Sequence, residues 1–141
     1  MLKYLIVLLC SSFNFIIAQS NEIEIPLLGF GCSETLNPTK AVGQFGILLK
    51  TKKYKKITNA LYSENSAEKF LSVIISEKLK SLGKIRLTEK DSLKIAEIKN
   101  SNELITVCSG CTYYDKLTMR QLFDEKNIIK ESSIIWLMYY F

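Results

Sequence analysis

The sequence predicts a mainly α-helical, single-domain bundle with a short two-stranded β element. Apolar residues recur at helical spacing in several segments, and residues that commonly cap helices stand at the starts of these segments. Two short stretches, 22–26 and 103–107, instead have the composition of strands. No linker or low-complexity tract divides the chain, so we expect residues 19–141 to form one domain.

The first two helices are predicted over residues 38–49 and 54–61. Asn37 and Pro38 are typical of an N-cap and a first helical position. The apolar positions at helical spacing are Val42, Phe45 and Leu49 in the first segment and Tyr54, Ile57 and Leu61 in the second.

The clearest helical pattern begins after Asn65 and stops at Gly83. Asn65 is a typical N-cap, and Glu68 three residues later completes a capping-box pattern. An apolar stripe interrupted only by Lys78 predicts that this helix lies against the core. The stripe consists of Phe70, Leu71, Ile74, Ile75, Leu79 and Leu82.

Three further helices are predicted in the second half of the chain. Thr88 with Asp91 starts a helix that ends near Asn100, and Thr118 with Gln121 forms a second capping box, flanked by Leu117 and Leu122 as a hydrophobic staple. Residues 127–141 fit either a helix or a strand, and we predict a helix capped by Asn127. Its expected buried face consists of Ile128, Ile129, Ser132, Ile135, Trp136 and Tyr139.

The β element is predicted from two short segments. Residues 103–107 (ELITV) are rich in β-branched and apolar residues and lead into Cys108. Residues 22–26 (EIEIP) alternate glutamate and isoleucine, as in a half-buried strand, with Pro26 at its end. We expect these two strands to pair.

Residues 57–79 (ITNALYSENSAEKFLSVIISEKL) resemble a HEAT-type helical hairpin. A helix ends in small and apolar residues, a polar Ser-Glu-Asn turn follows, and a second helix packs back. The resemblance implies a scaffold or binding role. The wider pattern, with Cys32 early and VCSGCTYY late, is similar to small exported bacterial proteins of unknown function, which implies no activity.

The N-terminus has the features of a signal peptide. Lys3 precedes a largely apolar stretch from Tyr4 to Ile17, and the small residue Ala18 stands at the expected cleavage site. We therefore expect residues 1–18 to be removed and the protein to be exported, to the periplasm, the envelope or the medium. An uncleaved anchor is the alternative, although the stretch is short for a membrane span. Leu9 before Cys10 argues against lipoprotein processing.

The composition excludes several function classes. The chain has no histidine, which removes Ser-His-Asp and Cys-His nucleophiles and most zinc or copper sites. The formal charge of +5 attracts anionic lipid or glycan weakly, and export argues against nucleic acid as a partner. We predict a non-catalytic binding or structural module without a cofactor, whose partner is a protein or another envelope component. A glycosidase-like carboxylate pair that meets only in the fold is the enzymatic alternative.

Three cysteines remain after Cys10 leaves with the signal peptide: Cys32, Cys108 and Cys111. In an oxidising compartment, disulfide formation is their default chemistry. A bridge from Cys32 to Cys108 or Cys111 closes a loop of roughly 75–80 residues, which stabilises the fold by about 4 kcal/mol in the chain-entropy relation. We expect a structural disulfide of Cys32, with its partner left open.

The Cys-x-x-Cys motif at Cys108 and Cys111 raises two alternatives. One is a dithiol redox centre, but such centres stand at a helix N-terminus, and the next cap, Thr118, is seven residues after Cys111. Asp115 also disfavours a thiolate. The other is a zinc site that adds Cys32 as a third ligand and an acidic side chain or water as the fourth.

The segment KTKKYKK at residues 50–56 concentrates positive charge. We interpret it as a solvated helix end and turn with Tyr54 directed inward. The alternative is a patch that binds anionic lipid head groups or acidic glycan, formed by Lys50, Lys52, Lys53, Tyr54, Lys55 and Lys56. Residues 29–31 (GFG) are a separate candidate, for a phosphate-binding loop. They lack the lysine of that motif, and we interpret them as a turn.

Overall fold

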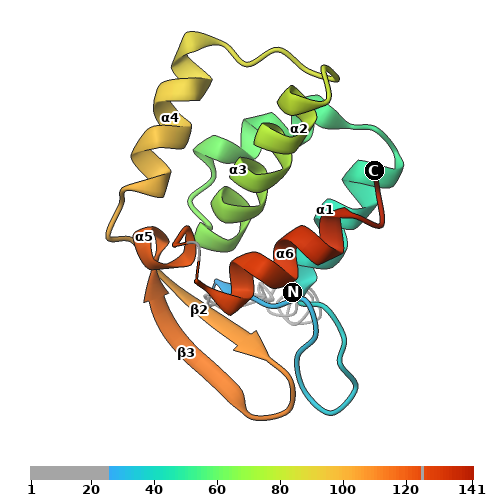
Figure 1. The fold of residues 1–141 in the computed structure, drawn as a ribbon, viewed down its shortest axis with the longest axis vertical. Coiled ribbons are helices and arrows are strands. Elements are labelled where there is room, and N and C mark those ends of the chain that lie inside the picture. Colours follow the sequence, from blue (N-terminus) through green and yellow to red (C-terminus); the bar gives the residue numbers. More distant parts are fainter. Residues whose placement is uncertain (1–25, 125) are drawn as a thin grey trace, which may run out of the picture.

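The computed structural model describes residues 26–124 and 126–141, so the expected signal peptide and residues 22–25 of the first expected strand lie outside the described residues. The helices are α1 (Lys40–Lys50), α2 (Tyr54–Asn59), which continues into a 3₁₀ turn (Ala60–Tyr62), α3 (Ser66–Ser81), α4 (Glu89–Lys99), α5 (Met119–Leu122) and α6 (Ile128–Leu137). The strands are β1 (Leu27–Leu28), β2 (Leu104–Ser109) and β3 (Tyr113–Thr118). Helices form most of this structure and the sheet lies at one end of them (Figure 1), which confirms the mainly helical prediction.

Helix α3 is the centre of the helical part, and α1, α2 and α4 pack against it. The predicted stripe residues Phe70, Leu71, Ile75 and Leu79 are fully buried, whereas Leu82, the C-cap, remains 44% exposed. Two further residues, Ser72 and Ser76, are also fully buried, and the apolar pattern did not predict them. The Ser72 hydroxyl donates to the carbonyl of Ile57 and so joins α3 to α2.

Most of the predicted helix caps are confirmed. The Asn65 side chain accepts from two backbone N–H groups at the start of α3, and Asn127 accepts from Ile129 N–H at the start of α6. Thr88 with Asp91 and Thr118 with Gln121 form complete capping boxes, although α5 is a single turn. The capping box of α3 is incomplete, because the carboxylate of its expected second member, Glu68, accepts from the Ser63 hydroxyl at 2.6 Å instead.

The predicted start of the first helix at Asn37 and Pro38 is wrong. Helix α1 begins at Lys40 after the N-cap Thr39. The Thr39 hydroxyl does not cap the helix: it donates to the carbonyl of Gly29 at 3.2 Å and accepts from Gly29 N–H at 3.3 Å. The Asn37 carbonyl accepts from Cys32 N–H at 2.9 Å. The local cap signal was therefore overridden, because these groups hold the loop between β1 and α1.

The expected two-stranded element is a three-stranded sheet in the order β1-β2-β3. Strand β1 lies parallel to β2, with Leu28 opposite Val107, and β3 is antiparallel to β2. Of the strand expected at 22–26 only Pro26 is described; its carbonyl accepts from Thr106 N–H at 3.2 Å, directly before β1. Strand β3 was not predicted, because most of its side chains are exposed and its polar sequence YYDKLT lacks apolar alternation.

Helix α6 is confirmed, but its predicted buried face is only partly correct: Ile129 and Trp136 face the core as expected. The buried residues are Ile129, Ser133 and Leu137, with Trp136 and Tyr140 partly buried against the core. Three residues expected inside are largely exposed: Ile128 at 55%, Ile135 at 59% and Tyr139 at 83%. The aromatic contacts set this rotation, since the Trp136 ring packs on Phe30 and Tyr140 with centroid distances of 5.5 and 5.2 Å.

Candidate functional site

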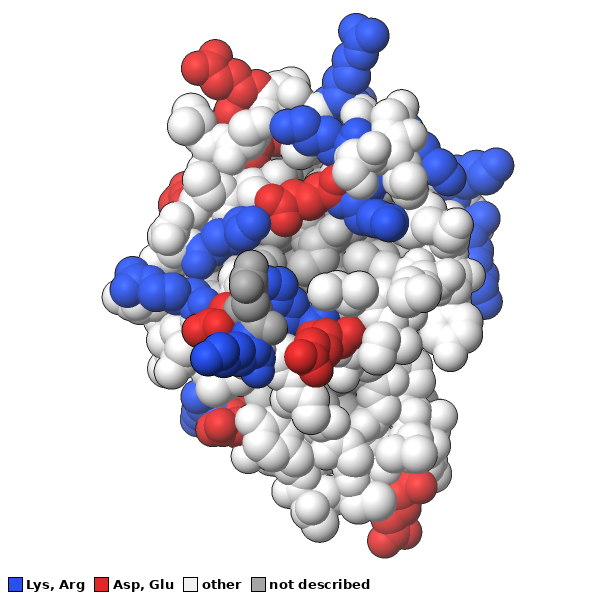
Figure 2. All heavy atoms as spheres, viewed as in Figure 1, with Lys and Arg blue, Asp and Glu red and all other residues white. Residues whose placement is uncertain are grey.

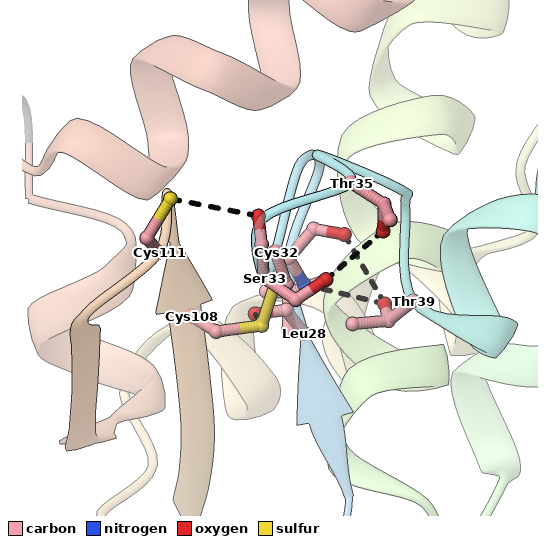
Figure 3. The surroundings of a disulfide bond; sticks show 8 residues. Leu28, Cys32, Ser33, Thr35, Thr39, Cys108 and Cys111 are labelled. Atoms are coloured by element: carbon pink, nitrogen blue, oxygen red, sulfur yellow. Dashed lines mark hydrogen bonds between the residues drawn. A yellow bond between two sulfur atoms is a disulfide. The ribbon is translucent and has the colours of Figure 1, made fainter.

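The first candidate feature is the disulfide between Cys32 and Cys108, which answers the question of connectivity that the sequence left open. Cys108 is on β2, and Cys32 is in the loop after β1 (Figure 3). Parallel pairing of β1 with β2 brings the two segments together, and the Cα atoms of the cysteines lie 5.6 Å apart. Both cysteines are buried, and the bond joins segments 76 residues apart in the chain.

Gly29 lets the chain pass close to this disulfide. A Cβ atom at this position would collide with the sulfur atoms of both Cys32 and Cys108 and with the Cys108 carbonyl. The Thr39 hydroxyl fixes the Gly29 peptide groups from the other side. The segment GFG thus belongs to the loop after β1 and packs on the disulfide at Gly29, and the hydrogen-bonded turn follows it at residues 33–36.

Cys111 lies in the turn between β2 and β3 and is exposed, with no disulfide partner among the described residues. Its sulfur points to the backbone of the Cys32 loop, 3.9 Å from the Ser33 carbonyl oxygen (Figure 3). Of the two cysteines in the Cys-x-x-Cys motif, Cys108 alone forms a disulfide within the described part of the chain, and it does so with Cys32. Within residues 26–124 and 126–141, no three Cys, Asp or Glu side chains are grouped as metal ligands.

The disulfide also bears on the compartment. Disulfides form and persist in oxidising, non-cytoplasmic settings. None of the helices in the part of the chain that the structure describes is long and apolar enough to cross a membrane.

The lysine cluster of residues 50–56 occupies the end of α1, the following turn and the start of α2. Its five lysines are exposed, and Tyr54 is partly buried against the core. Lys52 adopts a positive φ of 54° in the turn. In the described residues, none of these lysines forms an ion pair with a carboxylate, so their charge is available to solvent or to an anionic surface.

The second candidate feature is a groove between α3 and α6, with a volume of about 640 Å³, which sequence reasoning missed. Figure 2 shows a hollow on the face that carries these helices, with basic and acidic side chains around it. We call it the α3–α6 groove. Its apolar lining consists of Ile74, Leu82, Phe123, Ile134, Leu137, Met138 and Phe141, and its polar lining of Glu77, Lys78, Ser81, Lys99, Lys130 and Ser133.

Several apolar side chains of this groove are open to solvent. Met138 is 72% exposed, Ile134 52%, Leu82 44% and Phe141 40%. Scattered exposed apolar residues are ordinary, but these four share one concave surface. A volume of this size also falls in the range of small-molecule sites, about 300–1,000 Å³. The only sequence signal of the groove is the surplus of apolar residues on residues 128–141.

No protein-family model matches the chain, and neither a curated protein nor a solved structure matches it. The fold and the site define a disulfide-stabilised, mainly helical protein that carries an apolar groove bordered by lysines.

Proposed function

We propose that this chain is an exported, non-catalytic binding module whose ligand site is the α3–α6 groove. The observation that carries the proposal is the set of exposed apolar side chains gathered in one concave site, because such a surface costs solubility unless it binds something. The disulfide supports export, since it requires an oxidising compartment.

The role of the disulfide in this module is to hold the sheet together. It ties the loop after β1 to β2, while the Lys69–Glu103 ion pair at 2.8 Å joins α3 to the segment just before β2. The groove is formed by the helical part of the chain. The sheet and its disulfide therefore stabilise the scaffold and do not contribute to the ligand site. The HEAT-like hairpin interpretation is compatible with this role: α2 and α3 are consecutive, packed helices that present a surface.

The dithiol function of Cys108 and Cys111 is the alternative. It receives no support from the pairing of Cys108 with Cys32. Alkylation of the oxidised protein followed by mass spectrometry separates the two: the binding-module proposal expects one modified cysteine, Cys111, and a dithiol protein expects mild reductant to release Cys108 together with Cys111.

The test of the groove uses Nile red, a neutral dye that fluoresces in apolar sites, and two neighbouring variants of α6. Ile134 lines the groove and Ile135 does not, yet their exposed fractions are similar, 52% and 59%. We expect Ile134→Glu to weaken dye binding about tenfold or more and Ile135→Glu to leave it unchanged, since only the first change places a charge in the apolar site. Equal binding by both variants, or no binding by the wild type, contradicts the proposal.

Export is tested separately, by N-terminal sequencing of the full chain after expression in a host with a secretory pathway. We expect the exported form to begin at Gln19. Retention of residues 1–18 in an exported form would favour the uncleaved anchor.

A further inference from the structure

We infer that the ligand of the α3–α6 groove is an amphiphile with one acyl chain and an anionic head group. This inference rests on the proposed function and adds the chemical class of the ligand. The charged side chains around the groove are not balanced, because positive charge is in excess.

Three lysines and one glutamate line the groove. Lys99 is already paired, because its ammonium group lies 3.0 Å from the Glu77 carboxylate and 5.7 Å from the centre of the Phe123 ring. Lys78 and Lys130 have no carboxylate partner among the described residues. The described lining therefore carries two positive charges that no protein group neutralises.

Lys130 is suited to bind a head group. It is only partly exposed, and its ammonium group donates to the carbonyl of Phe123 at 3.0 Å, which fixes its position at the groove. A lysine has three N–H donors, so two remain for a ligand. A carboxylate or phosphate would accept these bonds, and charge-assisted bonds of this kind are stronger than neutral ones.

The rest of the groove suits an acyl chain rather than a compact anion. Ile134 and Leu137 line it from α6, and Met138 and Phe141 line it from the residues directly after this helix. Ile74 and Leu82 line it from α3. A small anion such as free phosphate would leave these side chains in water, whereas an acyl chain covers them.

The experiment measures displacement of Nile red from the wild-type protein by twelve-carbon amphiphiles below their micelle concentrations. Dodecanoate and dodecyl phosphate carry a negative head group, dodecyl maltoside a neutral one and dodecyltrimethylammonium a positive one. We expect the anionic chains to displace the dye at concentrations about tenfold lower than the neutral chain, the effect of one charge-assisted hydrogen bond, and the cationic chain, which the lysines repel, to displace it least well. The two anionic probes distinguish a fatty acid from a phospholipid-type head group.

Chain length gives a second readout. Each methylene buried in an apolar site strengthens binding about fourfold, so octanoate, decanoate and dodecanoate should bind with increasing affinity. Equal affinity along this series would show that the acyl chain is not in the groove, and would overturn the inference.

Lysine variants locate the head group. We expect Lys130→Gln to weaken dodecanoate binding about tenfold and Lys78→Gln, at a more exposed position, about threefold, with Nile red binding retained in both. Lys80→Gln is the matched control, because Lys80 is also an exposed lysine of α3 but does not line the groove. Thermal unfolding of each variant shows whether the fold is intact.

The failures of the two proposals are distinguishable. Loss of all Nile red binding in the wild type contradicts the proposed function itself. Dye binding without preference between anionic and cationic chains, or without any displacement by amphiphiles, overturns only the identity of the ligand and points to another occupant such as a peptide.

Discussion

Removal of the Cys32–Cys108 disulfide tests whether this bond stabilises the folded structure. Both cysteines are replaced by alanine, so that no new unpaired thiol remains at the site. With a sequence separation of 76 residues, the chain-entropy relation gives a loss of about 4.5 kcal/mol in the free energy of unfolding. This corresponds to a change of about 2,000-fold in the folding equilibrium.

The assay is urea unfolding followed by the fluorescence of Trp136, which packs between Phe30 and Tyr140 and therefore reports the core around α6. For a denaturant slope of about 2 kcal/mol per molar urea, the midpoint of the double variant should fall by about 2 M. Wild-type protein in excess reductant should show a similar fall, because it loses the same bond and keeps both side chains.

Cys111→Ala is the matched control for this experiment. Cys111 is exposed and has no disulfide partner in the described residues, so its replacement should change the free energy of unfolding by less than about 0.5 kcal/mol. The structural role of the disulfide would be refuted if its removal lowered the free energy of unfolding by less than about 1 kcal/mol. It would also be refuted if Cys111→Ala had a larger effect than the double variant.

Three further predictions concern other parts of the structure. Gly29→Ala should destabilise the fold by about 1–3 kcal/mol in urea unfolding, because its Cβ meets both disulfide sulfurs, whereas Gly43→Ala, in open space on α1, should stabilise it by about 0.5–1 kcal/mol. The hydrogen bond from the Thr88 hydroxyl lowers the pKa of Asp91. Ionised Asp91 therefore stabilises α4 fully at pH values above the ordinary aspartate pKa, near 3.9, and this stabilisation is lost as the pH falls through the lower pKa of the folded state. Thr88→Ala should raise the pKa of Asp91 in an NMR titration and cost about 1 kcal/mol at neutral pH, and an unchanged titration would contradict this account. In the lysine cluster, replacing Lys52 and Lys53 by glutamine should weaken sedimentation with phosphatidylserine vesicles about fivefold per lysine, and the wild-type binding should fall steeply with salt; salt-independent binding would refute an electrostatic contact.

The parts of the fold that the sequence predicts correctly are those that depend on neighbouring residues. Asn65, Thr88, Thr118 and Asn127 act as caps in the structure, because a cap is satisfied by backbone groups two or three residues away. Thr39 shows the limit of this reasoning. Its hydroxyl has the same local option, but the distant Gly29 offers it both a donor and an acceptor.

Features that depend on tertiary contacts were predicted less well. The partner of Cys32 follows from the parallel pairing of β1 with β2, which no spacing in the sequence reveals. Strand β3 is held by its pairing with β2, and its exposed side chains leave no apolar pattern. Ser72 and Ser76 are buried because other elements surround α3, and a serine carries no sign of that in the sequence.

The partly wrong face of α6 and the missed groove have one physical cause. Residues 128–138 contain so many apolar side chains that helical periodicity does not select a single buried face. Two aromatic residues determine which face is buried. The Trp136 ring packs on Phe30 and Tyr140, and the Tyr140 hydroxyl lies against Gly46 of α1, where a Cβ atom would collide with it. The apolar residues left over then face solvent, and Ile134 and Met138 among them line the α3–α6 groove. A helix with more apolar surface than its own core can cover is locally inconsistent with a simple globular fold, and such inconsistencies concentrate at functional sites. The apolar residues of α6 that the core does not cover are therefore an argument that this helix carries a binding surface.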